Sequence, residues 1–304
     1  MPRHITIAFP GQGSQYSGML NHFSDKFLGK IKQDVINALS FNIFEASEND
    51  EELNKTSVTQ PAILLASYLE FKYITENYSI KPDFLCGHSL GEYSALAVAG
   101  SIDLIDAIRL VHERGKLMEK SNKGQMYAIL NTPLEFVSKY CSIASKELGL
   151  VVSPANINSP KQIVISGDLE AVELTVKYLK ENGVKKCIKL NVSTPSHCDL
   201  MTDAAEKFTD IINNTTFKIP NYKILHNVDV NSSDDIHEIK NKLINQLTKP
   251  VQWVNTMEYI KNYDSVFIEC GPKNVLCSLA KANTIDNIYS TSSKDFINEI
   301  EHIL

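Results

Sequence analysis

The chain has 304 residues, of which 43% are hydrophobic and 22% are charged; this is the composition of a folded globular protein and excludes a disordered chain. Its 30 basic and 36 acidic residues give a formal net charge of -6, so it lacks the strong positive field that holds a nucleic-acid backbone. A chain of this length forms one large domain, or a main domain that carries a smaller one.

The first predicted element is a buried strand over Ile5–Phe9, a short run of β-branched and aromatic residues. The sequence PGQGSQ follows it and predicts a tight loop, which places Gln12 at the carboxyl end of the strand. Helices are predicted over Lys30–Leu39 and Gln60–Glu76. Pro61 suits the first turn of the second helix, because its missing N–H would have no intrahelical partner there.

A second buried strand is predicted within Asp83–Gly91, and an Ala-rich helix follows it directly. Another helix is predicted from about Asp103 to Lys120. Further strands are expected at about Lys223–Asn227 and Ser265–Glu269. Because strands alternate with helices, we expect an α/β fold with a mostly parallel sheet that is covered on both faces.

The rhythm of the pattern changes between about Gln125 and Val192. The predicted elements are strands at Met126–Leu130, Leu150–Ala155, Gln162–Ser166 and Val184–Leu190, and helices at Leu134–Leu148 and Leu169–Glu181. The loop from Asn156 to Pro160 would join the two middle strands as a hairpin. This βαββαβ order is the ferredoxin-like signature. We therefore expect a catalytic core over residues 1–124 and 193–304, with a ferredoxin-like subdomain inserted at 125–192.

The sequence GHSLG at residues 87–91 fits the G-x-S-x-G pattern and stands between the second strand and the Ala-rich helix. A strand-to-helix elbow needs both glycines because the turn is tight and the backbones approach closely. This context favours Ser89 as a nucleophile over a purely structural turn. The N–H of Leu90, at the start of the helix, is then a natural donor to a developing oxyanion.

A serine hydroxyl requires a general base, and His197 is the favoured candidate among the histidines. It lies in the irregular segment STPSHCD, where the chain re-enters the predicted core. A histidine in a loop is more often a structural residue, so this assignment depends on Ser89. No acid follows in the order that hydrolases use, and a backbone carbonyl or an amide is the alternative group to orient the ring.

Arg114 falls on the apolar stripe of the helix Asp103–Lys120, whereas Arg109 lies off it. The chain has 27 lysines and only three arginines, and a guanidinium on a buried face needs an anion or a polar partner. Two interpretations stay open. Arg114 forms a structural salt bridge, with Glu92 as a candidate partner, or its guanidinium binds a substrate carboxylate through two parallel hydrogen bonds.

Cysteine spacing, the length of apolar stretches and a lysine run indicate the cellular environment and the surface of the protein. The six cysteines form no C-x-x-C pair, which argues against a metal site and a disulfide framework. No apolar stretch is long enough for a membrane span, and the N-terminal apolar run is too short for a signal peptide, so we expect a cytoplasmic protein. A lysine run between Lys177 and Lys189 is typical of a solvated face, with a docking patch as the alternative.

Five sequence motifs together resemble the malonyl-CoA:acyl carrier protein transacylases of bacterial fatty-acid synthesis. They are FPGQGSQ at 9–15, GHSLGEYSA at 87–95, RGKLM at 114–118, VSTPSHC at 192–198 and QLTKPVQW at 246–253. The resemblance spans nearly the whole chain, with the motifs in family order. It implies an α/β-hydrolase-like core with an inserted ferredoxin-like subdomain.

The resemblance also implies a role for each matched residue. The catalytic residues would be Ser89 as the acylated nucleophile, His197 as its base, and Gln246, whose backbone carbonyl would orient His197. The oxyanion hole would be formed by the backbone N–H groups of Gln12 and Leu90. The residues that bind substrate would be Arg114, which holds the malonyl carboxylate, together with Met118, Met126 and Asn156.

The implied reaction moves a malonyl group from malonyl-CoA to Ser89 and then to the phosphopantetheine thiol of acyl carrier protein. No cofactor, metal, nucleic acid or membrane is expected, and a monomer is the default. Two other function classes stay open. One is a serine hydrolase or thioesterase that uses the same elbow with water as acceptor, and the other is a catalytically silent module that binds the carrier protein.

Overall fold

The computed structural model describes residues 4–78, 80–192 and 194–301. A parallel sheet of five strands forms its centre, in the order β7-β2-β1-β8-β9. The strands are β1 (Ile5–Phe9), β2 (Phe84–Gly87), β7 (Lys223–Leu225), β8 (Val266–Glu269) and β9 (Ile288–Ser290). The prediction of an α/β fold with a mostly parallel sheet is therefore confirmed.

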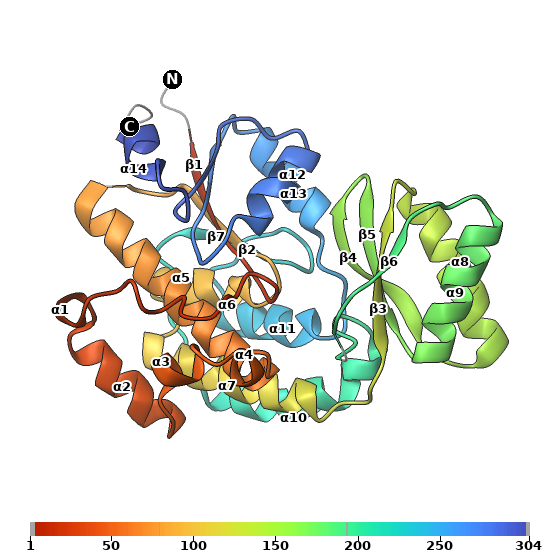
Figure 1. The fold of residues 1–304 in the computed structure, drawn as a ribbon, viewed down its shortest axis with the longest axis horizontal. Helices are drawn as coiled ribbons and strands as arrows, with labels where there is room; N and C mark the ends of the chain where they lie inside the picture. Colours follow the sequence, from red (N-terminus) through yellow and green to blue (C-terminus); the bar gives the residue numbers. More distant parts are fainter. Residues whose placement is uncertain (1–3, 79, 193, 302–304) are drawn as a thin grey trace.

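Helices cover both faces of this sheet (Figure 1). Successive side chains of a strand point to opposite faces, so Ile7 and Phe9 join one apolar core and Ala8 joins another. The first core includes residues of α2 (Lys30–Leu39), α3 (Ile43–Ala46), α5 (Thr56–Tyr78), α6 (Gly91–Val98), α7 (Leu104–Glu119), α10 (Thr202–Asn214), α11 (Ile236–Gln246) and α14 (Phe296–Glu301). The second core includes residues of α12 (Trp253–Lys261) and α13 (Val275–Ala282). The short segments α1 (Asp25–Leu28), α4 (Asp50–Leu53) and η1 (Asp199–Met201) complete this part.

A second, antiparallel sheet lies beside the first (Figure 1). Its strand order is β4-β5-β3-β6, with β3 (Gln125–Leu130), β4 (Val152–Ser159), β5 (Gln162–Gly167) and β6 (Cys187–Lys189). The helices α8 (Leu134–Leu148) and α9 (Leu169–Glu181) pack on one of its faces around a separate core. Together the elements follow the βαββαβ order that the sequence predicts.

The hairpin of the small sheet differs from its prediction. The residues from Asn156 to Ser159 are strand rather than loop, which leaves only Pro160 and Lys161 for the turn. Asn156 pairs with Val164 on one side, and on the other side it forms a bridge to Val251 of the main body. This second partner is distant in the sequence, so local pattern does not reveal that the strand continues.

The long helix α5 begins at Thr56, so Pro61 lies inside it and not in its first turn as predicted. A proline at this position cannot donate to the carbonyl of Ser57, four residues earlier. The ring of His112 on α7 contacts that carbonyl instead, with Nδ1 2.7 Å from the oxygen. A side chain from a neighbouring helix therefore allows α5 to start before the proline.

Two glycines make the turn between β2 and α6 possible. A Cβ on Gly87 would overlap the backbone of Gly91, and a Cβ on Gly91 would overlap the carbonyl of Phe9 on β1. The end of β2, the start of α6 and the end of β1 are therefore packed backbone against backbone. This close approach places the three residues between the two glycines, Ser89 at their centre, at the carboxyl edge of the parallel sheet.

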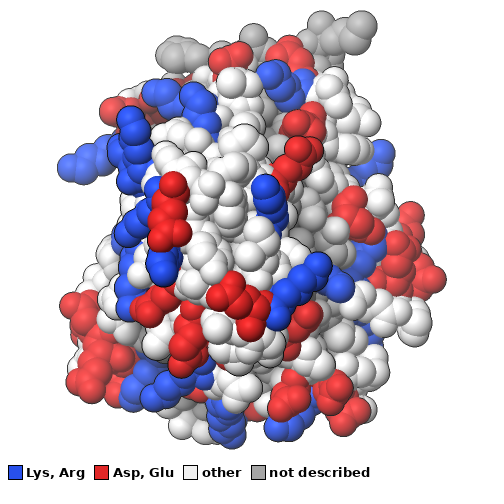
Figure 2. Space-filling view, turned by 90° about the vertical axis from the view of Figure 1, so that its right-hand side faces the viewer, with Lys and Arg blue, Asp and Glu red and all other residues white. Residues whose placement is uncertain are grey.

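No helix in the described ranges is long and apolar enough to cross a membrane. The view onto the end that carries the small sheet shows lysines interspersed with acidic residues (Figure 2). On α9, which belongs to the small sheet's layer of helices, Lys177 Nζ lies 4.0 Å from a carboxylate oxygen of Glu181. The charges on this face are therefore mixed in sign.

We predict that Gly91→Ala lowers the free energy of unfolding by about 3 kcal/mol or more, because a methyl group cannot fit against the Phe9 carbonyl. Gly149→Ala is the matched control: Gly149 has φ 66° but open space around it, so only backbone strain of about 1 kcal/mol is expected. Urea unfolding of both variants checks this. Equal losses would show that the close approach at Gly91 is not limiting.

Candidate active site

Ser89 occupies the elbow between β2 and α6 with a φ of 53°, a left-handed conformation that costs free energy for a residue with a side chain. Asn227, which follows β7, holds this turn on both sides. Its Oδ1 accepts a 2.7 Å hydrogen bond from the Ser89 N–H, and its Nδ2 donates a 2.6 Å bond to the Gly87 carbonyl. One side chain thus fixes the strained backbone and aims the serine out of the sheet edge.

The structure brings His197 to Ser89. Its Nε2 lies 2.8 Å from the Ser89 Oγ, and its Nδ1 lies 2.6 Å from the backbone carbonyl oxygen of Gln246. A carbonyl only accepts hydrogen bonds, so Nδ1 carries the proton and Nε2 presents a lone pair to the serine hydroxyl. A backbone carbonyl therefore does the orienting that an acid performs in most triads.

His197 is 3% exposed, and its environment disfavours a charged ring. Burial, followed by the positive charge of Arg114, lowers the pKa of His197 from 6.5 to about 3, although the hydrogen bond to Gln246 opposes the shift. The ring is therefore neutral at physiological pH, which is the form that a general base requires.

Arg114 is buried, as its place on the apolar stripe of α7 predicts, and it lies beside the nucleophile. Its Nη1 donates to Oε1 of Gln60 at 2.9 Å, and its Nη2 donates to Oε1 of Gln246 at 3.0 Å. The same Nη2 is 3.4 Å from the Ser89 Oγ, and the guanidinium carbon lies 5.2 Å from the centre of the Tyr93 ring.

The salt bridge to Glu92, considered from the sequence, is not formed. In the described part of the chain Arg114 has no carboxylate within ion-pair distance, and its Nε has no hydrogen-bond partner. Burial lowers the pKa of the Arg114 guanidinium. Two amide oxygens and the Ser89 Oγ accept from three of the five N–H groups of the guanidinium, and the remaining donors are available to a ligand anion.

The two residues predicted for the oxyanion hole lie at the same edge of the sheet. Leu90 is the N-cap residue of α6, and Gln12 follows β1. The loop that carries Gln12 packs against the elbow, since a Cβ on Gly11 would lie 2.6 Å from the His88 carbonyl oxygen. Within the described ranges, neither backbone N–H donates a hydrogen bond, so both are available to an anion.

The remaining predicted site residues lie at different places. Met118 is buried one turn after Arg114 on α7, with its sulfur 3.4 Å from Nε2 of Gln60. Met126 packs with small and branched residues on the face of the small sheet opposite α8 and α9. Asn156 lies on β4, where the small sheet meets Val251. No described contact joins Met126 or Asn156 to the serine or the arginine.

Four residues of the site were missed or not assigned a role: Gln60, Glu92, His226 and Asn227. Gln60 on α5 and Glu92 on α6 are polar residues that are fully buried, as Arg114 is on α7. His226 and Asn227 follow β7 directly, at the same sheet edge as Ser89. The predicted strand Lys223–Asn227 included both residues, whereas β7 ends at Leu225, so their position after the strand was missed.

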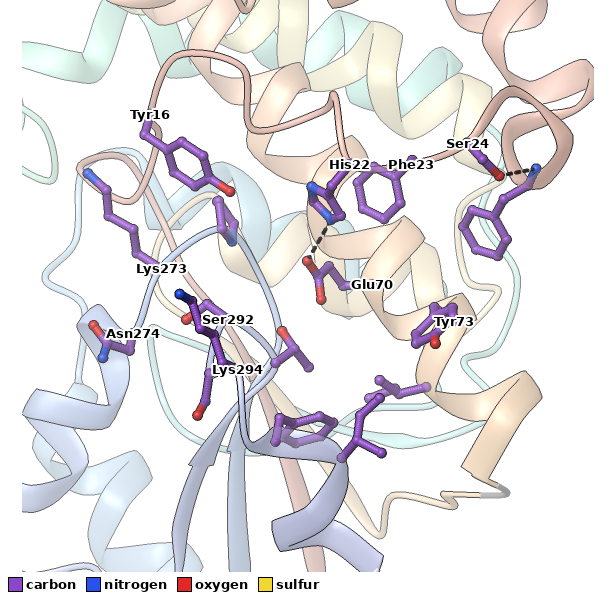
Figure 3. A pocket seen from close by; sticks show the side chains of 17 residues that line it. Tyr16, His22, Phe23, Ser24, Glu70, Tyr73, Lys273, Asn274, Ser292 and Lys294 are labelled. Atoms are coloured by element: carbon purple, nitrogen blue, oxygen red, sulfur yellow. Dashed lines mark hydrogen bonds and ion pairs between the residues drawn. The ribbon is translucent and has the colours of Figure 1, made fainter.

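Cavity volume does not identify this site. A cavity of about 820 Å³ lies between α5, the segment around Tyr16 and His22, and the segment after β9, where Lys294 stands (Figure 3). None of the predicted site residues lines it. Among the described residues, no group of three or more His, Cys, Asp or Glu side chains could hold a metal ion.

Comparison with known proteins agrees with this geometry. The family model of the acyl transferase domain matches residues 6–295. A malonyl CoA-acyl carrier protein transacylase of Haemophilus influenzae is 39% identical, and the alignment covers 99% of both chains. The protein of the same name from Bacillus subtilis is 38% identical, with 91% of this chain and 89% of that chain covered.

Solved structures show the same fold over the full length. The malonyl CoA-acyl carrier protein transacylase of Coxiella burnetii superposes with a TM-score of 0.94 at 35% identity, and covers 100% of this chain and 98% of that one. A malonyl-transacylase solved in complex with its type II PKS acyl-carrier protein has a TM-score of 0.91 at 36% identity, over 98% and 99% of the two chains. The chain therefore belongs to the malonyl-CoA:acyl carrier protein transacylase family of acyl transferases.

Proposed function

We propose that the protein transfers a malonyl group from malonyl-CoA to the phosphopantetheine thiol of acyl carrier protein, through an ester on Ser89. The observation that carries this proposal is the position of the Ser89 Oγ between a base and a buried cation. His197 Nε2 is 2.8 Å from that oxygen on one side, and Arg114 Nη2 is 3.4 Å from it on the other. The names of the relatives support the same reaction.

In the first half-reaction His197 takes the proton of the Ser89 hydroxyl while Oγ attacks the thioester carbonyl of malonyl-CoA. The carbonyl oxygen becomes an anion, and the free N–H groups of Gln12 and Leu90 are its proposed donors. When the intermediate collapses, the C–S bond breaks and the proton on His197 passes to the sulfur of coenzyme A. The malonyl group then remains as an ester on Ser89.

The second half-reaction reverses these roles. The phosphopantetheine thiol gives its proton to His197, its sulfur attacks the Ser89 ester, and the proton returns to Oγ as the C–O bond breaks. Ester and thioester exchange in both steps, so these side chains supply every proton transfer. Arg114 holds the free carboxylate of the malonyl group throughout, which is the proposed basis for choosing malonyl over acetyl donors.

Further assignments accompany this proposal. Met118, Met126 and Asn156 are proposed to line the acyl site, with Met118 supported by its place beside Gln60. Residues 1–124 and 193–304 are proposed as the catalytic core and 125–192 as the inserted subdomain, supported by the separate core of the small sheet. A cytoplasmic location agrees with six free cysteines.

The proposed function predicts that the intact mass of acyl carrier protein increases by one malonyl group when malonyl-CoA and this enzyme are present. Ser89→Ala should abolish the transfer, because no other described hydroxyl lies within hydrogen-bond distance of the His197 Nε2. Steady release of malonate to water, with no malonyl carrier formed, would indicate a hydrolase instead. Binding of the carrier without any turnover would indicate a non-catalytic module.

We predict that Arg114→Ala lowers the preference for malonyl-CoA over acetyl-CoA by about tenfold or more, because a hydrogen bond to a charged group is lost. Arg114→Lys should also be impaired, since an ammonium group cannot bond Gln60, Gln246 and a carboxylate with the geometry of a planar fork. Arg109→Ala on the exposed face of the same helix is the control. Values of kcat/KM for both donors check this, and an unchanged ratio in both Arg114 variants would contradict the clamp.

The low pKa of His197 predicts how the reactivity of Ser89 depends on pH. An uncharged sulfonyl fluoride should modify Ser89 at a rate that stays constant from about pH 8 to about pH 5, because His197 remains neutral over this range. In Arg114→Ala one cause of the low pKa is removed, so the rate should begin to fall at a higher pH than in the wild type. A wild-type rate that halves near pH 6.5 would contradict this description of the base.

A further inference from the structure

The reaction proposed above leaves one fully buried acid without a role. Glu92 lies three residues after Ser89 on α6 and is 0% exposed. An unpaired charge at such a position is costly, so its partners must account for it. Its only ion-pair neighbour among the described residues is the ring of His226, at 2.6 Å.

Three N–H donors converge on the two carboxylate oxygens of Glu92. Oε1 accepts from Nδ1 of His226, while Oε2 accepts from Nε2 of Gln246 at 2.6 Å and from the backbone N–H of Asn227 at 3.1 Å. A carboxylate has no donor of its own and can accept all three bonds, which an amide cannot do without conflict.

The ring of His226 bonds Glu92 through one nitrogen only. Its Nδ1 donates to Glu92 Oε1, and its Nε2 is buried and has no partner among the described residues. A single proton on Nδ1 therefore satisfies this contact without placing an N–H at Nε2, where no acceptor lies. The guanidinium of Arg114 is the other buried cationic group close to Glu92.

The side chain of Gln246 links Glu92 to Arg114. Its Nε2 donates to Glu92 Oε2, and its Oε1 accepts from Arg114 Nη2 at 3.0 Å, so one amide separates the two charges. Both charged side chains are buried, and Arg114 has no carboxylate in contact. The three hydrogen-bonded side chains of Arg114, Gln246 and Glu92 together carry no net charge. The guanidinium itself is not in contact with a carboxylate.

We propose that Glu92 is the counter-ion of Arg114, held one amide away by Gln246 so that the guanidinium remains open to a substrate carboxylate. A direct ion pair between Glu92 and Arg114 would occupy the guanidinium N–H groups that the substrate carboxylate needs. At the greater separation, Glu92 balances the buried cation in the empty site. It also weakens the attraction of the site for a carboxylate, because two buried negative charges then face each other across Arg114.

This proposal rests on the role of Arg114 as carboxylate clamp, and it predicts a gain of affinity. Glu92→Gln removes the charge and keeps the size of the side chain. Nδ1 of His226 can accept from the new NH₂ group when the ring proton moves to Nε2, and Gln246 keeps an acceptor. The N–H at Nε2 is then buried without a partner, which lowers the stability of the variant but does not restore the removed charge. Monomethyl malonate carries the same free carboxylate as a malonyl group, and its Kd should fall by about fivefold to tenfold, as expected for removing one nearby charge in a site of intermediate dielectric constant.

The test is calorimetric titration of monomethyl malonate into wild type, Glu92→Gln, His226→Asn and Arg114→Ala. His226→Asn keeps a donor near Glu92 Oε1 and changes no charge, so its affinity should not exceed that of the wild type. Misfolding or loosening of the site would weaken binding in every variant, and only removal of a repulsive charge would strengthen it.

The outcomes separate this inference from the proposed function. If Arg114→Ala loses binding but Glu92→Gln does not gain it, the counter-ion role of Glu92 is wrong and the clamp stands. If the wild type does not bind monomethyl malonate, or binds it equally after Arg114→Ala, both the clamp and the counter-ion are overturned. Tighter binding in Glu92→Gln alone is the result that the structure predicts.

Discussion

The arrangement of this site depends on one constraint, a guanidinium buried beside Ser89 without an acid in contact with it. Arg114 is 1% exposed, and amide oxygens of Gln60 and Gln246 receive two of its N–H groups. Burying a charge costs desolvation free energy, and a protein retains a buried charge only where other groups compensate for that cost. Its positive charge also contributes to the low pKa of His197, so Arg114 and His197 are electrostatically linked.

A second constraint is the strained elbow, and the two constraints share residues. Asn227 bonds the backbone on both sides of His88, and its own N–H is held by Glu92. The Gln246 side chain bonds the Ser89 carbonyl at 3.0 Å, while its backbone carbonyl orients His197. Ser89, His197 and Arg114 are therefore positioned by one buried network at the carboxyl ends of β1, β2 and β7, the edge where open α/β sheets bind ligands.

Local pattern was sufficient to predict the strand Ile5–Phe9, the elbow around Ser89 and the burial of Arg114, because each depends on neighbours close in the sequence. Local pattern failed where the bounds of an element depend on a contact with a residue that is distant in the sequence. The strand through Asn156 continues because Val251 bonds it, and α5 starts before Pro61 because a histidine of another helix serves the free carbonyl. The polar network behind the serine could not be predicted for the same reason: its members come from separate elements and meet only in the folded chain.

The central claim is that one malonyl group can be bound at both ends, as an ester on Ser89 and as a carboxylate on Arg114. A crystal structure of the enzyme after brief exposure to malonyl-CoA tests this most directly. We expect continuous density from the Ser89 Oγ to a carboxylate in hydrogen-bond contact with the guanidinium, with the bonds from Arg114 to Gln60 and Gln246 retained. An ester whose carboxylate points to solvent, or an acyl group on another residue, would contradict it.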